Sequence, residues 1–245
     1  MEWATGKRRL MRVVRRFEAR GVPTGPDFFP AALDLMGIEI DVPALEIARV
    51  PRHGPLVVVA NHPHGLVDGM VLAAIVGRRR TDYRILTRSL LTKVPEIADH
   101  TIPVPFPNAR GAAAANLEVR RRAMAHLARG GAVILFPAGG VAVAERAFGP
   151  AIEPPWSPFT AKLIRRSGAS VLPVRFPGQN SRAYQIAHRI SPLLRQGLLL
   201  HEVAHALNRP QRPVIGALIP PGAQHRSAAW LRAHTLSLTA GRAYP

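Results

Sequence analysis

Leu56-Val-Val-Val-Ala60, followed by Asn61-His-Pro-His-Gly-Leu-Val-Asp-Gly69, is the stretch that decides the fold of this chain. Five apolar residues in a row are typical of a strand that is buried on both faces. The polar turn after them leads into a helix-forming segment from Leu66 to about Val76. In open α/β sheets, ligands bind beyond the carboxyl ends of strands. The stretch therefore predicts an α/β fold with chemistry in this turn.

Two histidines and one carboxylate in the turn form a candidate acid-base group. His62 precedes Asp68 by six residues, and on one continuous helix this separation would turn their side chains about 240° apart. Pro63 and Gly65 favour a turn at His62 instead, so that Asp68, in the first turn of the next helix, faces back toward it. His64, four residues before Asp68, would share its helix face. We predict His62 as the base, because only His62 sits at the loop position from which Asp68 can orient it. The alternative is that Asp68 only stabilises the helix N-terminus while the histidines bond the backbone.

Composition limits the chain to one domain and to a few kinds of chemistry. Its 245 residues, 47% of them hydrophobic, are enough for one sizeable core. The absence of cysteine excludes disulfides, a thiolate nucleophile and Cys-ligated zinc, and it agrees with a reducing, cytoplasmic compartment. The N-terminal segment holds no uninterrupted apolar stretch, since Asp34 breaks the run from Pro30 to Leu35, so we expect no cleaved signal. No apolar run approaches about eighteen residues without a polar break, so we expect no membrane span.

The net charge of +18 favours polyanionic partners, meaning nucleic acid, an anionic lipid surface or a phosphorylated substrate. In residues 7–20, Leu10, Val13, Val14 and Phe17 follow helical spacing between seven basic residues. Such a helix is suited to an anionic membrane surface, although the same apolar stripe would also dock on the domain. Nucleic-acid binding without catalysis is a weaker alternative, because the arginines are scattered and few aromatic residues lie among them.

The remaining elements alternate along the chain. Strands are predicted at 38–42, 45–50, 83–87, 101–104, 132–136, 171–175 and 214–218, and helices at 28–36, 112–129, 157–167 and 192–208. After the Pro220-Pro-Gly222 break, a C-terminal basic helix is predicted to about Gly241. This alternation predicts an α/β fold whose largely parallel central sheet is covered by helices on both faces. The N-terminal basic amphipathic helix would precede it.

A competing motif lies near the C-terminus. His201-Glu202-Val-Ala-His205 matches the H-E-x-x-H zinc site of many metalloproteases, in which both histidines share a helix face. A catalytic zinc needs a third protein ligand, yet no carboxylate follows Glu202 and Gln211 occupies the place of a third histidine. The later histidines lie beyond a Pro-Pro-Gly break. We therefore expect no metal site, and a zinc metalloprotease remains the alternative enzyme class.

Four blocks of the sequence resemble, in order and spacing, the motif blocks of the glycerolipid acyltransferase superfamily. They are Asn61-His with Asp68-Gly, the run 102–110, Phe136-Pro-Ala-Gly-Gly140 and Val171-Leu-Pro-Val174. More narrowly, the chain resembles the hemolysin-like branch of bacterial lysophospholipid acyltransferases, where the His and Asp are one residue further apart than in the commoner His-x4-Asp form. Pro154-Pro-Trp156 and the run 177–182 resemble that branch too. The resemblance covers about residues 36–220, which we take as an acyltransferase domain between a basic helical segment (1–35) and a basic C-terminal tail or helix (221–245).

The resemblance implies an acyltransferase of membrane lipid biosynthesis, peripheral on the inner face of the cell membrane. His62 would take the proton from a lysolipid hydroxyl as that oxygen attacks an acyl thioester, and Asp68 would hold the imidazole. The thioester would be carried on coenzyme A or acyl carrier protein, with no other cofactor. Backbone N–H groups around Gly139 and Gly140 would stabilise the oxyanion.

The substrate-binding side departs from the family pattern. Arg110 is expected to bind a phosphate or carboxylate of the acceptor, and His64 is a further candidate substrate-binding residue; the alternative for Arg110 is a solvated residue before a helix. The third block commonly carries a glutamate, in places occupied here by Ala138 and Gly140. Glu145 is a candidate substitute. The acceptor therefore stays open between lysophosphatidic acid, a lyso-aminolipid and another monoacylated lipid.

Overall fold

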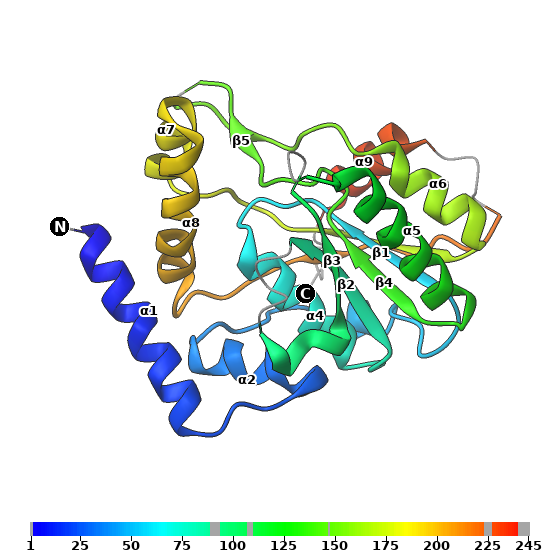
Figure 1. The fold of residues 1–245 in the computed structure, drawn as a ribbon, viewed down its shortest axis with the longest axis horizontal. Coiled ribbons are helices and arrows are strands. Elements are labelled where there is room, and N and C mark those ends of the chain that lie inside the picture. Colours follow the sequence, from blue (N-terminus) through cyan, green and yellow to red (C-terminus); the bar gives the residue numbers. More distant parts are fainter. Residues whose placement is uncertain (1, 89–93, 107–109, 147, 223–226, 240–245) are drawn as a thin grey trace, which may run out of the picture.

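The central element of this computed structural model is a six-stranded sheet between two layers of helices (Figure 1). The structure describes residues 2–88, 94–106, 110–146, 148–222 and 227–239. The strand order is β3-β2-β4-β1-β7-β8, and only the last pair is antiparallel. The strands are β1 (Leu56–Ala60), β2 (Tyr83–Arg88), β3 (Thr101–Val104), β4 (Ala132–Leu135), β7 (Ser170–Arg175) and β8 (Val214–Ile215). The predicted largely parallel sheet is confirmed.

Strand β1 lies in the middle of the sheet, and all five of its residues are buried. Its side chains alternate between two apolar clusters, as the two-residue period of a strand requires. Val57 and Val59 join the cluster formed with α5 (Ala112–Ala128), α6 (Pro158–Ser167) and α9 (Ala228–Leu236). Leu56, Val58 and Ala60 join the cluster formed with α2 (Phe28–Leu35), α4 (Leu66–Gly77) and α8 (Pro192–Ala206). Helices therefore cover both faces, as predicted.

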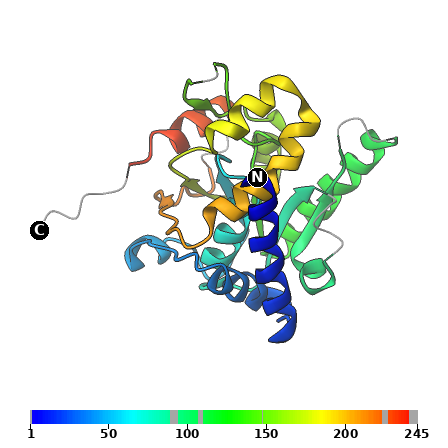
Figure 2. The same cartoon turned by 90° about the vertical axis from the view of Figure 1, so that its left-hand side faces the viewer.

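Helix α1 (Glu2–Ala19) lies along α8 (Figure 2). Leu10, Val13 and Phe17 pack against the core cluster, and the Phe17 ring meets the Phe28 ring edge to face at 5.3 Å. Met11 and Val14 remain exposed, as do most of the arginines. The predicted apolar stripe is therefore used mainly to dock the helix on the domain. Among the described residues, no helix is long and apolar enough to cross a membrane.

The predicted strand at 45–50 is wrong, because this segment begins with the short helix α3 (Ala44–Ile47). Pro43 precedes the helix, and its carbonyl accepts the first helical hydrogen bonds, from the amides of Glu46 and Ile47. The predicted strand at 38–42 is reduced to one isolated bridge between Ile40 and Gln211.

Strand β8 is shorter than the predicted 214–218. It ends at Ile215, opposite Val174, and the next β7 residue in line is Pro173, which has no N–H to donate to the ladder. The Gly216 amide bonds the Pro173 carbonyl at 2.9 Å, and a side chain at Gly216 would come within 2.8 Å of the Pro173 ring. Pairing resumes only at the bridge between Val171 and Ile219.

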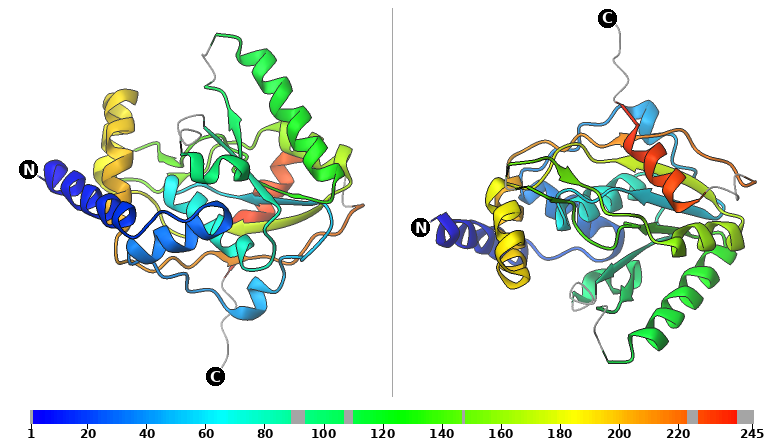
Figure 3. Two further views of the ribbon diagram at one scale, coloured as in Figure 1. Left: turned by 60° about the horizontal axis from the view of Figure 1, so that its bottom comes forward. Right: turned by 90° about the horizontal axis from the view of Figure 1, so that it is seen from above.

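Two features beyond the carboxyl ends of the strands were not predicted. Strands β5 (Val143–Ala144) and β6 (Ala151–Ile152) form a small hairpin after β4, and α7 (Arg182–Ile190) follows β7. The Gln185 side chain accepts a hydrogen bond of 2.8 Å from the Ala144 amide, so α7 and the hairpin are joined. Together with α8, they lie at one end of the sheet (Figure 3). The longer predicted helices agree within about two residues, whereas the C-terminal helix already ends at Leu236 and its predicted end falls partly outside the described residues.

Candidate active site

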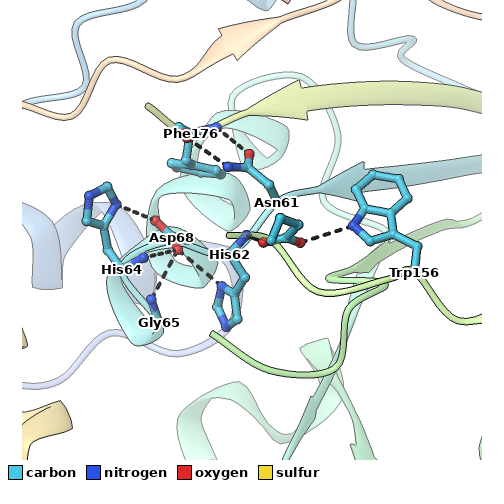
Figure 4. A network of polar contacts seen from close by, with 8 residues as sticks. Asn61, His62, His64, Gly65, Asp68, Trp156 and Phe176 are labelled. Carbon is cyan, nitrogen blue, oxygen red and sulfur yellow. Dashed lines mark hydrogen bonds and ion pairs between the residues drawn. The ribbon is translucent and has the colours of Figure 1, made fainter. Parts of the chain in front are cut away.

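The turn after β1 leaves the sheet at a fixed point because Asn61 bonds the neighbouring strand end (Figure 4). The buried Asn61 side chain donates to the Phe176 carbonyl at 2.8 Å and accepts from the Phe176 amide at 2.7 Å. Phe176 directly follows β7. These two bonds tie the end of β1 to the end of β7, and they fix the position of the main chain just before His62.

Asp68 lies in the first turn of α4, is completely buried and faces back into the turn, as predicted. Its carboxylate accepts from the backbone amides of His64 (2.8 Å) and Gly65 (3.1 Å). It also contacts Nδ1 of His62 at 3.1 Å and Nδ1 of His64 at 3.0 Å. Burial alone would raise the pKa of Asp68, but the bonds to both histidines outweigh it and lower the pKa.

The prediction that only His62 can be oriented by Asp68 is wrong, because the carboxylate holds both rings. Exposure does not separate them either, since the side chains are 18% and 22% exposed. Burial would lower the pKa of His64, yet the Asp68 bond and the charges of Asp68 and Glu202 together raise it. The two histidines therefore differ in what surrounds their outer nitrogens, not in their contact with Asp68.

The outer nitrogens have different surroundings. A Cβ atom at Gly178 would lie 3.0 Å from Nε2 of His64, so the chain after β7 covers that ring edge. His62 instead stacks on Phe136, with ring centroids 3.9 Å apart at 23°. Among the described residues, none bonds Nε2 of His62. With Nδ1–H assigned toward Asp68, Nε2 is an unprotonated acceptor at the carboxyl edge of the sheet.

Glu153 is a site residue that the sequence analysis missed. It is 5% exposed, and its two oxygens accept from the His62 amide at 3.1 Å and from the Trp156 indole at 3.0 Å. Burial raises the pKa of Glu153, although these two bonds oppose the shift. The only sequence signal was the adjoining Pro154-Pro-Trp156. Glu145, the predicted substitute for the family glutamate, is exposed on the hairpin instead.

The backbone of His62 is held from its carbonyl side as well. The Ala142 amide donates to that carbonyl at 2.9 Å, so β4 and the chain after it support the turn. Together with Glu153 and Asn61, this bond fixes the main chain of the turn through partners far apart in the sequence. The position of the imidazole is therefore determined by the folded domain as a whole.

The glycines after Phe136 form a turn beside the site. Gly139 has φ +66°, and its amide bonds the Phe136 carbonyl at 3.0 Å, so this N–H is engaged and does not serve an oxyanion in this conformation. Gly140 is exposed, with open space where a side chain would lie. Arg88, at the carboxyl end of β2, donates to the Gly139 carbonyl at 2.6 Å. Burial lowers the pKa of Arg88, and no sequence signal had marked this residue.

Arg110 lies outside this group as far as the structure describes it. It is exposed and directly precedes Gly111, the N-cap of α5. Within the described ranges, no hydrogen bond or ion pair of Arg110 is present. The adjoining residues 107–109 of the same block lie outside the described residues. The role of Arg110 stays a prediction.

The His201-Glu202-Val-Ala-His205 motif in α8 differs from the His62 turn in what its carboxylate bonds. Glu202 is buried, and its carboxylate accepts from the Ser181 amide at 2.8 Å and from the Ser181 hydroxyl at 2.5 Å, at the start of α7. The His201 and His205 rings lie 6.4 Å apart, and Nε2 of His205 contacts Arg209 at 2.8 Å. In the described part of the chain, no group of three or more His, Cys, Asp or Glu residues is placed to hold a metal ion.

The fold and the site define an α/β protein that presents a carboxylate-oriented histidine at the carboxyl edge of a parallel sheet. The sequence pattern of an acyltransferase family matches residues 14–201, so the chain belongs to this acyltransferase family. The superfamily resemblance seen in the sequence is therefore confirmed.

Two relatives and one solved structure are similar to this chain. It is 29% identical over 159 residues to the lyso-glycine lipid O-acyltransferase of Phocaeicola vulgatus and 28% identical over 159 residues to that of Bacteroides thetaiotaomicron. Each match covers 64% of this chain but only 53% and 55% of the relatives, so the chain spans about half their length. The fold is similar to the crystal structure of the 1-acyl-sn-glycerophosphate acyltransferase PlsC from Thermotoga maritima, with a TM-score of 0.53, 17% identity and coverage of 95% and 84%.

Proposed function

We propose that this protein transfers a fatty acyl group from an acyl thioester to the hydroxyl of a lysolipid, with His62 as the general base. The observation that carries the proposal is the contact of 3.1 Å between His62 Nδ1 and the buried Asp68. This contact leaves Nε2 to accept a proton. Membership of the acyltransferase family supports the same reaction class.

In the proposed reaction, Nε2 of His62 removes the proton from the acceptor hydroxyl as its oxygen bonds to the thioester carbonyl carbon. The tetrahedral intermediate then expels the thiolate, which receives the proton back from the imidazolium. Asp68 fixes the tautomer and stabilises the imidazolium, as the acid does in a Ser-His-Asp triad. Because the substrate itself is the nucleophile, no acyl-enzyme forms.

The oxyanion of the intermediate requires donors, and we assign this role to the glycine turn beside His62. Gly140 is the better candidate, because the Gly139 amide already bonds Phe136. Arg88 holds the turn through the Gly139 carbonyl. Its cationic charge, at the carboxyl end of β2, also favours an acidic headgroup nearby. Arg110 remains the second candidate for such an anion.

For the acceptor, we propose a lysolipid with an acidic headgroup, and a lyso-glycine lipid is the first one to test because both named relatives carry that description. A glycine attached through its nitrogen keeps a carboxylate, which arginine binds well. Lysophosphatidic acid is the second, since it shares a hydroxyl and an anionic group. The donor is acyl-CoA or acyl-ACP, and both present the same thioester.

The reaction belongs to membrane lipid biosynthesis, and we propose that it takes place with the protein peripheral on the inner face of an anionic cell membrane. The strongly basic chain supports this location, because each basic residue near such a surface contributes about 1 kcal/mol. Screening at high salt would weaken the attraction.

An acceptor screen tests reaction and substrate together. Radiolabelled long-chain acyl-CoA and acyl-ACP are offered with lyso-glycine lipid, lysophosphatidic acid and an uncharged monoacylglycerol, and the His62→Ala protein serves as the blank. We expect labelled diacyl product from an acidic lysolipid only with wild-type protein. Equal label in the blank, or no product from any acceptor with either donor, would contradict the proposed function.

A further inference from the structure

The exposed face of α7 carries both of its isoleucines. Ile186 and Ile190 lie four residues apart, which places them on one side of the helix, and they are 38% and 69% exposed. The buried residues of this helix include Tyr184 and Gln185. A helix that only packs on a domain turns its aliphatic side chains inward, so this arrangement indicates that a further surface covers the isoleucines.

Two more exposed apolar residues adjoin them. Leu194, one turn into α8, is 52% exposed, and Phe148, in the loop of the β5–β6 hairpin, is 79% exposed. The guanidinium of Arg182 lies over the Phe148 ring at 5.7 Å, which joins hairpin and helix. We call Phe148, Ile186, Ile190 and Leu194 the apolar rim. Figures 1 and 3 show the hairpin, α7 and the start of α8 together at one end of the sheet.

The rim lies at the same edge of the sheet as the His62 turn. The hairpin follows β4 and α7 follows β7, and the carboxyl ends of parallel strands meet at one edge of the sheet. Helix α8 passes the turn closely, since a side chain at Gly65 would meet Leu199 at 3.5 Å. Leu66, the next residue, is 36% exposed. Whatever covers the rim therefore lies at the edge of the sheet that carries the candidate site.

The charge around the rim selects an anionic partner. The elements that carry the rim, residues 143–152 and 182–206, hold Arg146, Arg182, Arg189 and Arg195 against two carboxylates, the exposed Glu145 and Glu202, which is buried against Ser181. Arg189 donates to the Glu145 carbonyl, and Arg182, Arg189 and Arg195 belong to α7 and α8, the two helices that carry the aliphatic residues of the rim. A bilayer with anionic headgroups satisfies both features, because aliphatic tips enter the boundary of the acyl chains while arginines meet the phosphates.

Helix α1 is less suited to this contact than its sequence indicates. Leu10, Val13 and Phe17 already pack on the core, and among the side chains of α1 that the structure describes, Met11 and Val14 are the exposed large apolar ones. We propose that the apolar rim, rather than the α1 stripe, inserts into an anionic bilayer. This contact would turn the edge of the sheet that carries His62 toward the lipid. This goes beyond the proposed reaction, because vesicle binding is measured without acyl transfer.

Flotation of the full chain tests the proposal with vesicles made of equal parts of phosphatidylglycerol and phosphatidylcholine, and with phosphatidylcholine alone. Wild-type protein is expected to float mainly with the anionic vesicles. Ile186→Ser with Ile190→Ser removes apolar contact from exposed positions, and we expect the partition coefficient to fall about tenfold or more. Phe148→Ser, in a different element, is expected to lower it as well.

Matched variants separate the rim from other surfaces. Leu117→Ser changes a leucine on α5 that is 67% exposed, and Met11→Ser with Val14→Ser tests α1; both are expected to float nearly as wild type. Unchanged flotation of the Ile186/Ile190 variant, or a larger loss in the Met11/Val14 variant, would overturn the proposal. The proposal would also be overturned if sedimentation showed that wild-type protein is a dimer, and that the Ile186/Ile190 variant is a monomer that still binds the vesicles.

His62→Ala keeps the two proposals distinct, because it is expected to float as wild type. Flotation that depends on the rim, without acyl transfer to any acceptor, would refute the proposed reaction and support the rim. Acyl transfer by wild-type protein, together with normal flotation of the Ile186/Ile190 variant, would support the proposed reaction and refute the role of the rim.

Discussion

Two stretches of this chain each place two histidines and one carboxylate close together, and they differ in what the carboxylate bonds. In the turn after β1, Asp68 accepts from both histidines and from the backbone around them. In α8, Glu202 turns away from His201 and His205 and bonds Ser181. The same residue types therefore orient a base in one region and anchor a helix start in the other. A motif predicts chemistry only when the folded chain directs its acid at its histidines.

The largest effect expected from this comparison is on acyl transfer. His62→Ala removes the base and is expected to lower kcat/KM by about 100- to 10,000-fold. His201→Ala, which changes the other motif, is expected to leave turnover near the wild-type value. Steady-state assays with the acceptor found in the screen compare them, with far-ultraviolet circular dichroism as the folding control. A comparable loss in the His201 variant would remove the distinction between the two stretches.

The two acids provide the next test. Asp68→Asn keeps the size of the side chain but favours the wrong tautomer of His62, so activity is expected to fall about 100-fold. Glu202→Gln loses a charged acceptor for Ser181 and is expected to lower the free energy of unfolding by about 1–3 kcal/mol while kcat changes little. Urea denaturation and activity are measured on both variants. Wild-type turnover in the Asn variant would exclude Asp68 from the mechanism.

Glu153 extends the test to a positioning residue. Glu153→Gln leaves one oxygen for two donors, the His62 amide and the Trp156 indole, so one donor faces an NH2 group. We expect kcat to fall about tenfold as the turn shifts, while KM is kept because no substrate contact is lost. Glu145→Gln, on the exposed hairpin, is the matched control. A change confined to KM would show that Glu153 binds the acceptor instead.

His64→Ala is expected to keep substantial activity but to show a pH-dependent loss of stability. Because the pKa of His64 is raised, its contact with Asp68 stabilises the protein fully below 6.5 and is lost as the pH rises through the raised pKa. Because the pKa of Asp68 is lowered, its contribution is present above 3.8 and is lost as the pH falls through the lowered pKa. The variant should therefore be most destabilised between pH 3.8 and 6.5. Urea titrations across this range check it, and a loss that grows above neutral pH would contradict it.

The smallest effect is expected from chelation. The α8 motif directs its acid at Ser181, so a chelator is expected to leave acyl transfer and thermal unfolding unchanged. Elemental analysis of tag-free protein is expected to find no stoichiometric zinc. One tightly held zinc per chain, lost in His201→Ala, would restore the metalloprotease alternative.

Local geometry explains why the sequence predicted Asp68 and its contact with His62. The relation involves a proline, a glycine and one helix turn, and none of it depends on distant residues. The sheet was predictable for a similar reason, because each buried strand is a short apolar run between turn residues. The one-sided prediction for His64 failed because the turn is tight enough for both rings to reach one carboxylate.

The missed residues depend on contacts across the chain. Glu153 meets the His62 amide only because the hairpin returns over the strand ends, 91 residues along the sequence. Arg88 is the last residue of β2, and the apolar pattern that predicts this strand says nothing about the role of its final side chain. Helix α7 exposes its isoleucines, so the usual rule that a helix buries its apolar face does not predict this exposed surface.

The two hydrogen bonds between Asn61 and Phe176 have a consequence for the order of folding. They join residues 115 apart in the sequence, and closing so long a loop is slow compared with forming the α4 helix or the turn itself. During synthesis, His62 and Asp68 emerge long before Phe176. The imidazole therefore gains its final frame only when β7 adds to the sheet, and a nascent chain that ends before β7 carries both residues without a working site.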